Sequence, residues 1–241
     1  MKVIAVIPAR FASTRFPGKV LADLNGKVIL QHVWEKCQKC RLLDKVLIAC
    51  DDKKIFDAVK VFGADVVMTS VKHVSGTDRI AEAVRKLNFD IVVNVQADEP
   101  LIESKTIDQL AKALINDRSA VMATVIKKTT DKIEIENPNV VKVVIDQKKY
   151  AIYFSRHAIP YQRGAEAGDH YKHLGIYAYR KKFLMQFSKL PKSSLEISEK
   201  LEQLRVIEAG YKIKTILTNM ETIGVDTPED LAKVKKYLNK N

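Results

Sequence analysis

The chain has 241 residues, of which 46% are hydrophobic and 29% charged, and its formal net charge is +12. These proportions are those of an ordinary soluble globular protein, long enough for a sizeable core in one large or two small domains. No apolar run approaches the length of a membrane span. The opening run Met1–Pro8 is too short for a signal peptide and lacks a cleavage site, so we expect a cytoplasmic protein without membrane partners.

The excess of basic residues suggests a polyanionic partner or a small acidic ligand. The lysines are scattered in ones and twos with acidic residues among them, and they do not form a basic arm. A salt-bridged, heat-stable surface shows the same pattern as a nucleic-acid-binding surface. The charge alone therefore does not decide between these classes of protein.

Three cysteines, Cys37, Cys40 and Cys50, give an odd number and no disulfide framework. Cys37 and Cys40 form a C-x-x-C pair, which is compatible with redox or metal chemistry. However, no second pair supplies the other ligands of a zinc site. Cys37 also continues the helical spacing of Leu30 and Val33, so we expect core packing for this pair.

Strand-like and helix-like segments alternate along the first half of the chain, which predicts an α/β fold with a doubly wound, mostly parallel sheet and crossover helices. Strands are expected at Val3–Ala9, Lys45–Ala49, Asp65–Thr69, from Ile91 onward and at Ala120–Ile126. Helices are expected at Val28–Leu42, at Ile55–Phe62 with a stop at Gly63, around Ile80–Leu87 and around Ile107–Leu114.

The segment after the first strand contains three cations, Arg10, Arg15 and Lys19, and the hydroxyl groups of Ser13 and Thr14. It has neither the glycine spacing of a dinucleotide-binding turn nor the residues of a P-loop. Its backbone N–H groups and side chains are nevertheless suited to bind phosphates. An ordinary solvated basic loop is the structural alternative.

A small polar turn, Ser75-Gly76-Thr77, precedes the helix that contains Ile80, and we expect Thr77 or Asp78 as its N-cap. The glycine would also let a planar base approach the backbone.

The strand that begins at Ile91 ends in two carboxylates and a proline, which cannot continue a central strand. Side chains alternate between the faces of a strand, so Asn94, Gln96 and Asp98 are expected to share one side. Open α/β sheets bind ligands beyond the carboxyl ends of their strands, where Asp98 would lie. The structural alternative is a solvated acid before a turn.

The second half of the chain departs from the regular α/β order. Its expected elements are an antiparallel hairpin of Val140–Ile145 and Tyr150–Phe154, a mobile loop at Gln162–His170, a strand at His173–Arg180, a helix that ends near Gly210 and a strand at Lys212–Leu217. No linker or repeat is visible. We therefore expect a single domain over residues 1–241, with an inserted subregion at about 137–180 that supports homodimer formation.

The last motif begins a helix. Thr227 is the expected N-cap, Pro228 occupies the first helical position, and Asp230 stands at the capping-box position. Asp226 lies one residue before the cap. Its carboxylate is not needed for capping and is available for another role.

Together these motifs resemble those of the cytidylyltransferases that activate 3-deoxy-manno-octulosonate (KDO) for lipopolysaccharide biosynthesis. The resemblance spans nearly the whole chain and is carried by PARFASTRFPGK (Pro8–Lys19), HVSGTDR (His73–Arg79), NVQADEP (Asn94–Pro100), NPNVVKVV (Asn137–Val144), YFSR (Tyr153–Arg156), HLGIYAYR (His173–Arg180), LEQLR (Leu201–Arg205) and GVDTPEDL (Gly224–Leu231). One departure is Ala97, where the family has glycine. If this position requires a positive φ, alanine costs on the order of 1 kcal/mol.

The resemblance implies a Rossmann-like nucleotidyltransferase fold and an in-line attack of the KDO anomeric hydroxyl on the α-phosphorus of CTP, which gives CMP-KDO and pyrophosphate. The residues suit this chemistry. Arg10, Arg15 and Lys19 offset the charge of a triphosphate and of the leaving pyrophosphate. Asp98 and Asp226 are hard oxygen ligands suited to Mg²⁺, the expected cofactor.

The resemblance also implies two sets of binding residues. Those for CTP are Ala9, Arg10, Ser13, Arg15, Lys19, His73, Ser75, Gly76, Asp78 and Gln96, and those for the sugar are Gln96, Arg156, His173, Tyr177, Glu202 and Gln203. Lys19, Asp98, Asp226 and Arg10 are expected to act in catalysis. Ordinary roles remain possible for Arg156 as the partner of a surface acid, for His173 as a satisfied strand residue and for Glu202 as a solvated helix charge.

Two further classes of function remain open. An acylneuraminate cytidylyltransferase or a sugar-1-phosphate nucleotidyltransferase would share the nucleotide motifs, whereas HLGIYAYR and LEQLR favour KDO. A basic nucleic-acid-binding protein would explain the charge. The sequence contains no interleaved aromatic and basic platform and no recognised binding module, so we expect no nucleic-acid partner.

Overall fold

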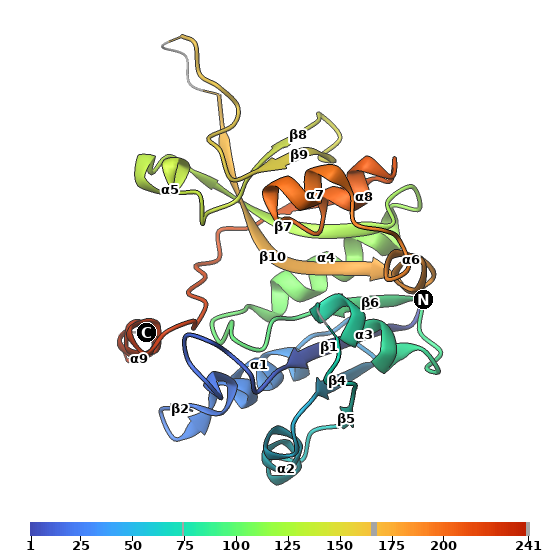
Figure 1. Ribbon diagram of the computed structural model, residues 1–241, viewed down its shortest axis with the longest axis vertical. Coiled ribbons are helices and arrows are strands. Elements are labelled where there is room, and N and C mark those ends of the chain that lie inside the picture. The colour runs from blue at the N-terminus through green and yellow to red at the C-terminus, as the bar shows by residue number, and fades with distance from the viewer. Residues whose placement is uncertain (74, 165–167, 240–241) are drawn as a thin grey trace.

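A nine-stranded sheet lies at the centre of the computed structural model, which describes residues 1–73, 75–164 and 168–239 (Figure 1). Its strands are β1 Val3–Ala9, β4 Lys45–Cys50, β5 Val66–Met68, β6 Ile91–Asn94, β7 Met122–Thr129, β8 Lys142–Ile145, β9 Ala151–Ser155, β10 His170–Arg180 and β11 Ile213–Leu217. Seven of them follow one another in the order β11-β7-β10-β6-β1-β4-β5.

Most neighbouring strands in this path are parallel. β1 pairs in parallel with β4 and β6, β4 with β5, and β7 with β11. β10 is antiparallel to both β6 and β7, and its N-terminal part also pairs with β8, beyond the end of β6. The predicted mostly parallel α/β sheet is confirmed.

The helices cover both faces of the sheet. They are α1 Ile29–Gln38, α2 Lys53–Val61, α3 Gly76–Val84, α4 Ser104–Asn116, α5 Lys132–Glu136, α6 Lys181–Phe187, α7 Ser194–Glu199, α8 Leu204–Glu208 and α9 Pro228–Leu238, together with the short 3-10 helix η1 Lys19–Leu21. None of these helices, in the part of the chain that the structure describes, is long and apolar enough to cross a membrane.

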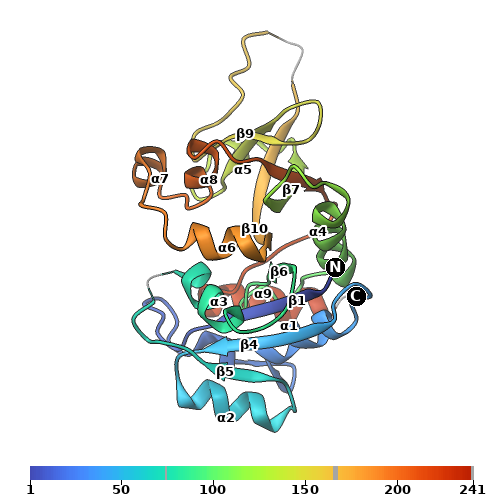
Figure 2. The ribbon, with the colours of Figure 1, turned by 90° about the vertical axis from the view of Figure 1, so that its right-hand side faces the viewer.

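The alternation of side chains along β1 explains why the sheet is doubly wound. Ala5 and Ile7 belong to a buried cluster with α1, α2 and α4, whereas Ile4 and Val6 belong to a cluster with α3, α6 and α8. Figure 2 shows α1 and α3 on opposite sides of β1. Cys37 and Cys50 are buried in the first cluster and Cys40 packs against it, which confirms the core role expected for the Cys37–Cys40 pair.

The predicted hairpin is confirmed, because β8 and β9 pair with Val144 opposite Tyr153. It is attached to the main sheet through β10. Residues 165–167 of the expected mobile loop lie outside the described residues, and β10 begins at His170, three residues before the predicted strand.

Other boundaries differ from the prediction. Helix α1 ends at Gln38, four residues early, and α3 ends at Val84. The expected N-cap at Thr77 or Asp78 is wrong: Ser75 caps α3 and accepts a hydrogen bond from the Asp78 N–H at 3.1 Å. The hydroxyl of Thr77 instead donates to Glu202 at 2.6 Å, so a tertiary contact uses the group that the local pattern assigned to the cap.

Three short helices, α5, α6 and α7, and the two-stranded sheet of β2 Asp23–Leu24 and β3 Lys27–Val28 were not predicted.

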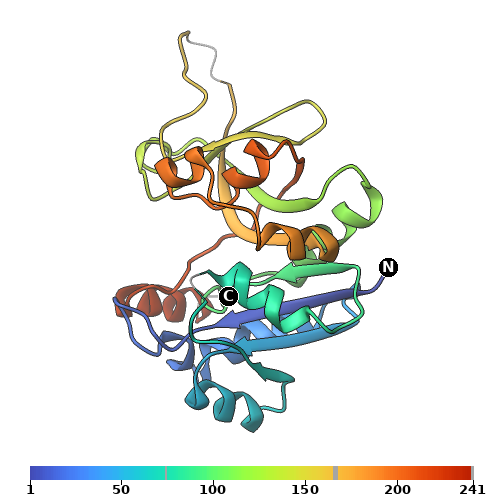
Figure 3. The ribbon, with the colours of Figure 1, turned by 45° about the vertical axis from the view of Figure 1, so that its right-hand side comes forward.

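The C-terminal segment returns from β11 to the N-terminal half of the molecule. Val225 and Val234 pack with Leu24 and Ile29 in a third buried cluster, and α9 lies beside the N-terminal loops in Figure 3. The Val225 N–H donates to the Asp98 carbonyl oxygen at 2.9 Å. This return places Asp226 next to the end of β6.

Candidate active site

The loop after β1 and the end of β6 line a cavity of about 450 Å³, here called the loop cavity. Its lining residues are Pro8, Arg10, Ala12, Ser13, Thr14, Arg15, Lys19, Val20, Gly76, Gln96, Ala97 and Asp98. Most of the CTP-binding residues expected from the sequence are in this set. The cavity therefore combines several cations, two hydroxyl groups and one carboxylate at the carboxyl ends of parallel strands.

The shape of the loop depends on Gly18 and Phe11. Gly18 has a φ of 68°, and a Cβ added there would lie 3.1 Å from the Phe11 ring, so this position favours glycine for its backbone and its space. The Gly18 N–H donates to the Phe11 carbonyl at 3.0 Å. The Phe11 N–H donates to Asp51 at 3.2 Å, and Asp51 forms a 2.8 Å ion pair with the fully buried Arg79 of α3. The start of the basic loop is thus tied to β4 and α3.

Lys19 joins the two carboxylates that were predicted as metal ligands. Its Nζ contacts Asp98 Oδ2 and donates to Asp226 Oδ1 at 2.7 Å, and Arg15 forms a 2.8 Å ion pair with Asp226 Oδ2. Burial lowers the pKa of Lys19, but the two carboxylates outweigh this effect and raise the pKa above its ordinary value. The side chain of Lys19 is therefore a protonated cation held between two acids.

Helix α9 positions Asp226 for this cluster. Thr227 and Asp230 form a capping box, with the Asp230 N–H donating to Thr227 Oγ1 at 3.3 Å, as the sequence predicted. The Asp226 carboxylate accepts hydrogen bonds from cations and does not cap the helix.

The donor set of this cluster fits Mg²⁺ in combination with a phosphate ligand. Two hard carboxylates converge on one ammonium, and Mg²⁺ is commonly bound by one or two carboxylates plus substrate phosphates and water. Within the described residues, no group of three or more His, Cys, Asp or Glu side chains is arranged to hold a metal alone. Asp98 and Asp226 therefore suit a cation that arrives with a nucleotide.

Ala97 lies next to this cluster and is 5% exposed. It is not among the described non-glycine residues with a positive φ. Alanine would be strained here only if the position required a positive φ. Since it does not, Ala97 fits the backbone.

A second cavity of about 620 Å³, here called the strand cavity, lies over β10 and the loops before α8 and α9. Its lining residues are Glu99, Glu134, Asn139, Val140, Val141, Lys172, His173, Leu174, Gly175, Tyr177, Lys200, Leu201, Glu202, Gln203, Thr222 and Gly224. Gln96 lies between the two cavities: it lines the loop cavity and donates to the carbonyl of Gly175 at 3.1 Å.

A bulge in β10 separates His173 from Tyr177. The register with β7 shifts between Leu174 and Tyr177, and the carbonyl of Ile176 accepts a 2.9 Å hydrogen bond from Thr124 Oγ1. Because Thr124 gives its proton to that carbonyl, the 2.8 Å contact between Thr124 and His173 assigns the proton to Nε2 of His173. Burial lowers the pKa of His173 to about 3, so this imidazole is neutral at physiological pH.

Two residues that line the strand cavity each have a buried polar atom without a hydrogen-bond partner in the described chain, Glu99 Oε2 and Gln203 Nε2. The Gln203 side-chain oxygen accepts from the Tyr177 hydroxyl at 3.4 Å, which orients the amide. Burial raises the pKa of Glu99 to about 7, and the negative charges of Asp98 and Asp226 contribute to this rise. Such buried polar atoms are normally satisfied, so a ligand with both donors and acceptors suits this cavity.

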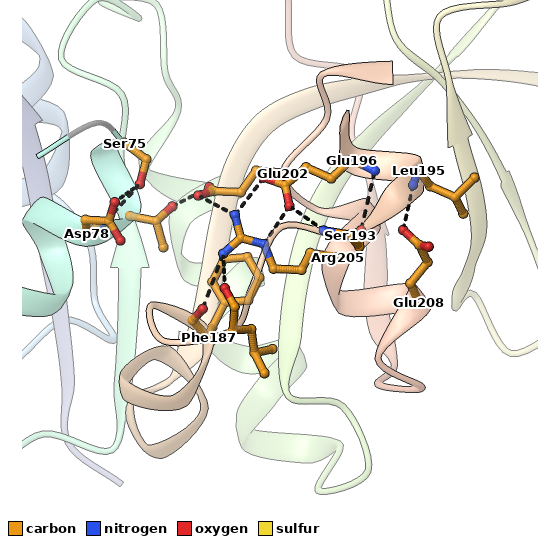
Figure 4. A network of polar contacts seen from close by, with 11 residues as sticks. Ser75, Asp78, Phe187, Ser193, Leu195, Glu196, Glu202, Arg205 and Glu208 are labelled. Atoms are coloured by element: carbon orange, nitrogen blue, oxygen red, sulfur yellow. Dashed lines mark hydrogen bonds and ion pairs between the residues drawn. The ribbon is translucent and has the colours of Figure 1, made fainter. Parts of the chain in front are cut away.

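A polar network holds Glu202 at the rim of the strand cavity (Figure 4). Glu202 accepts from Thr77 of α3, and its other oxygen lies 3.9 Å from Arg205. Arg205 donates two 2.6 Å hydrogen bonds to Glu196 of α7. Burial raises the pKa of Glu202, and the hydrogen bond from Thr77 opposes this effect. Ser75 and Asp78 lie beside this network and line a third cavity of about 390 Å³.

Several expected site residues lie elsewhere in the structure. The ring of His73 contacts Glu82 and lines neither cavity, and Ala9 is a buried residue at the end of β1. Arg156 donates to the carbonyl oxygens of Glu199 at 2.7 Å and Pro138 at 2.9 Å, and it does not line the strand cavity.

The strand cavity contains residues that the sequence analysis did not select. Lys172, Lys200 and Gly224 contribute to its wall, and Glu99 contributes a carboxyl group. Strand β6 ends at Asn94, so Glu99 lies in the turn that follows it, where side-chain alternation along a strand gives no signal.

Comparisons with known proteins identify the family of this chain. A family profile described as cytidylyltransferase matches residues 4–216. The 3-deoxy-manno-octulosonate cytidylyltransferase of Solibacter usitatus is 49% identical over 98% of this chain and 94% of its own length. That of Geotalea uraniireducens is also 49% identical and is covered completely, as is this chain.

A solved structure of CMP:2-keto-3-deoxy-manno-octonic acid synthetase complexed with CTP superposes with a TM-score of 0.96 and 41% identity, covering 100% of this chain and 99% of that one. A cytidylyltransferase from Leptospira borgpetersenii, 20% identical with a TM-score of 0.68 over 100% of this chain and 88% of its own, shares the fold. With the motifs, the fold and the full-length relatives in agreement, this chain belongs to the 3-deoxy-manno-octulosonate cytidylyltransferase family.

Proposed function

We propose that this enzyme transfers CMP from CTP to the anomeric hydroxyl of KDO and releases pyrophosphate, as a step in lipopolysaccharide biosynthesis. The observation that carries the proposal is that two consecutive residues, Asp98 and Glu99, line two different cavities. Asp98 lines the loop cavity, which is rich in cations, and Glu99 lines the strand cavity, which contains unpaired polar atoms. A triphosphate and a polyhydroxylated sugar would thus meet at the end of β6.

The loop cavity supplies the charges that this reaction needs. Arg10, Arg15 and Lys19 are positioned to offset the triphosphate and the negative charge that develops on the leaving pyrophosphate. Gly76 lies in the same wall of the cavity, where a Cβ added to it would lie 3.6 Å from the Pro8 side chain. Because Gly76 has no side chain, a nucleotide base has room at this position.

The strand cavity offers polar contacts for an acidic sugar. Lys172 and Lys200 can attract its carboxylate, and Gln203 offers an unused donor. Neutral His173 can bind a hydroxyl without adding charge. Gln96 lies between the two cavities and would contact both substrates.

We propose Mg²⁺ as the cofactor, held by Asp98 and Asp226 together with nucleotide phosphates. When bound there, the ion would neutralise phosphate charge and lower the pKa of an attacking hydroxyl group. The paired carboxylates on Lys19 support this proposal.

We also propose that the protein is a cytoplasmic homodimer. The free thiols of Cys37, Cys40 and Cys50 are consistent with a reducing compartment. Ile152 on β9 is 55% exposed and Tyr161 is 87% exposed, which provides apolar surface for a second copy. Light scattering should give the mass of a dimer, and a monomer at all concentrations tested would contradict the dimer.

A panel of acceptor sugars tests the reaction. The protein is incubated with CTP, Mg²⁺ and either KDO, N-acetylneuraminate or a sugar 1-phosphate, and the products are identified by mass spectrometry. We expect CMP-KDO alone. A product formed only with another acceptor would refute the KDO assignment and keep the cytidylyltransferase chemistry.

A further inference from the structure

The two carboxylates of the Asp98-Glu99 pair have different surroundings. Asp98 contacts Lys19 and lines the loop cavity. Glu99 has no ion pair or hydrogen bond from its side chain to another described residue, and its Oε2 is buried. The cavity that Glu99 lines is the strand cavity, with His173, Tyr177 and Gln203.

This arrangement does not stabilise the folded chain. A buried carboxyl oxygen without a partner loses its hydration and gains no hydrogen bond in return. A role confined to packing would be served better by an apolar or amide side chain. The cost of Glu99 is understandable if a ligand supplies the missing partner.

The neighbouring backbone leaves room for the Glu99 side chain. A Cβ added to Gly224 would lie 3.3 Å from Glu99 Oε1, closer than ordinary contact. Gly224 belongs to the segment that carries Val225, whose N–H is hydrogen-bonded to Asp98. The C-terminal segment therefore crosses Glu99 at a residue without a side chain and leaves the carboxyl group in the wall of the cavity.

A second unpaired group lies in the same cavity. Gln203 is 4% exposed, and its Nε2 has no partner in the described residues. The strand cavity thus contains an unused acceptor at Glu99 and an unused donor at Gln203. A molecule with several hydroxyl groups can satisfy both, because each hydroxyl donates one hydrogen bond and accepts others.

We propose that Glu99 is a sugar-recognition residue whose carboxyl group accepts a hydrogen bond from a hydroxyl group of the acceptor sugar. The inference rests on the proposed function for the identity of that sugar. It assigns a specificity-determining contact to the acceptor side of the Asp98-Glu99 pair, while Asp98 serves the nucleotide side.

The test compares Glu99→Ala and Glu99→Gln with the wild-type enzyme in steady-state kinetics. For Glu99→Ala we expect kcat/KM for KDO to fall about 10-fold to 100-fold, the effect of leaving a buried sugar hydroxyl without its hydrogen-bond partner, while KM for CTP changes less than about two-fold. Glu99→Gln keeps a carbonyl acceptor and should recover part of the loss. The melting temperature should not fall, because the native partner of Glu99 is not a protein group.

A matched control is Glu103→Gln, which changes an exposed carboxylate on the same segment that makes no capping hydrogen bond. It should leave both KM values unchanged. KDO analogues that each lack one hydroxyl complete the experiment. One analogue should have a low kcat/KM with the wild-type enzyme, and Glu99→Ala should lower that kcat/KM little further. The missing hydroxyl and the missing carboxyl group would belong to the same hydrogen bond, so removing either one removes the same contact.

Two results would overturn the assignment while KDO remains a substrate of the wild type. One is unchanged kinetics for KDO in Glu99→Ala. The other is an increased Mg²⁺ requirement with an unchanged KM for KDO, which would place Glu99 in the metal site. A wild-type enzyme that does not use KDO would instead refute the proposed function.

Discussion

Three segments that are far apart in the sequence meet at the ammonium group of Lys19. The loop after β1 contributes the lysine, the end of β6 contributes Asp98, and the residue before α9 contributes Asp226. The Lys19 side chain is 13% exposed and that of Asp226 is 43% exposed. These ion pairs are partly screened by water and add little to stability, so we interpret the cluster as functional.

Replacing Asp226 should therefore separate activity from stability. We expect Asp226→Asn to lower kcat by about 100-fold or more, because it removes a proposed metal ligand and a partner of Lys19. The free energy of unfolding should change by less than about 1 kcal/mol, since water partly screens the carboxylate of Asp226 and Lys19 keeps Asp98 as a partner. Pyrophosphate release and urea unfolding measure the two quantities.

The control for this variant is Asp65→Asn. Asp65 forms a 3.0 Å ion pair with Lys45 away from both cavities, and its loss should leave kcat unchanged. An Asp226→Asn enzyme with wild-type turnover would exclude the metal assignment.

His173 provides a prediction on pH. Its pKa is about 3 in the folded chain and near its ordinary value of 6.5 in the unfolded chain. Between these values the unfolded state binds a proton that the native state does not, so the free energy of unfolding falls as the pH is lowered through this window.

From pH 7 to pH 5 this residue should cost about 1–2 kcal/mol of stability, and His173→Gln should remove that part of the pH dependence. Urea unfolding of both proteins across this pH range measures the difference. Parallel stability curves for the two proteins would show that His173 is not buried as a neutral group.

Local patterns could predict some of these residues and not others. Asp98 was found because it follows a buried strand, and Asp226 because Thr227 already served as the cap. Arg156, which the resemblance assigns to the sugar, donates to two backbone carbonyls, a contact between segments that no local pattern contains. Glu99 was passed over because its significance lies in the lack of a partner, which only the packed structure reveals.

The main elements followed from periodicity, whereas the short helices α5, α6 and α7 did not. Helices of five to seven residues, such as α5 and α6, do not complete enough turns to show an apolar stripe. Helix α7 carried a readable signal that was missed: Ser193 and Glu196 form a capping box.

The turn between β8 and β9 allows a test of local backbone strain. Lys149 has a φ of 63°, in the left-handed region that favours glycine. We expect Lys149→Gly to raise the free energy of unfolding by about 0.5–1 kcal/mol, because relief of strain exceeds the entropic cost of glycine. Urea unfolding is the measurement.

Lys148→Gly in the same turn is the matched control. Lys148 is exposed and is not among the described residues with a positive φ, so glycine should only add freedom to the unfolded chain and lower stability. If both variants were destabilised equally, the left-handed conformation of Lys149 would be wrong.

At the level of the whole molecule, the site depends on two long-range features. β10 enters the sheet antiparallel between β6 and β7 and places His173 and Tyr177 beside the carboxyl end of β6. The C-terminal segment returns across the molecule and brings Asp226 and Gly224 to the same place. The sequence predicted the strands and the helix cap, but strand order and this return depend on packing between distant segments.

The most direct test of this account is pyrophosphate release from CTP and Mg²⁺, measured with and without KDO, with ATP, GTP and UTP as nucleotide controls. We predict release that requires both CTP and KDO, because the loop cavity and the strand cavity must both be filled for the reaction to occur. Release from CTP that is unaffected by KDO, or no release with any pair of substrates, would contradict the account.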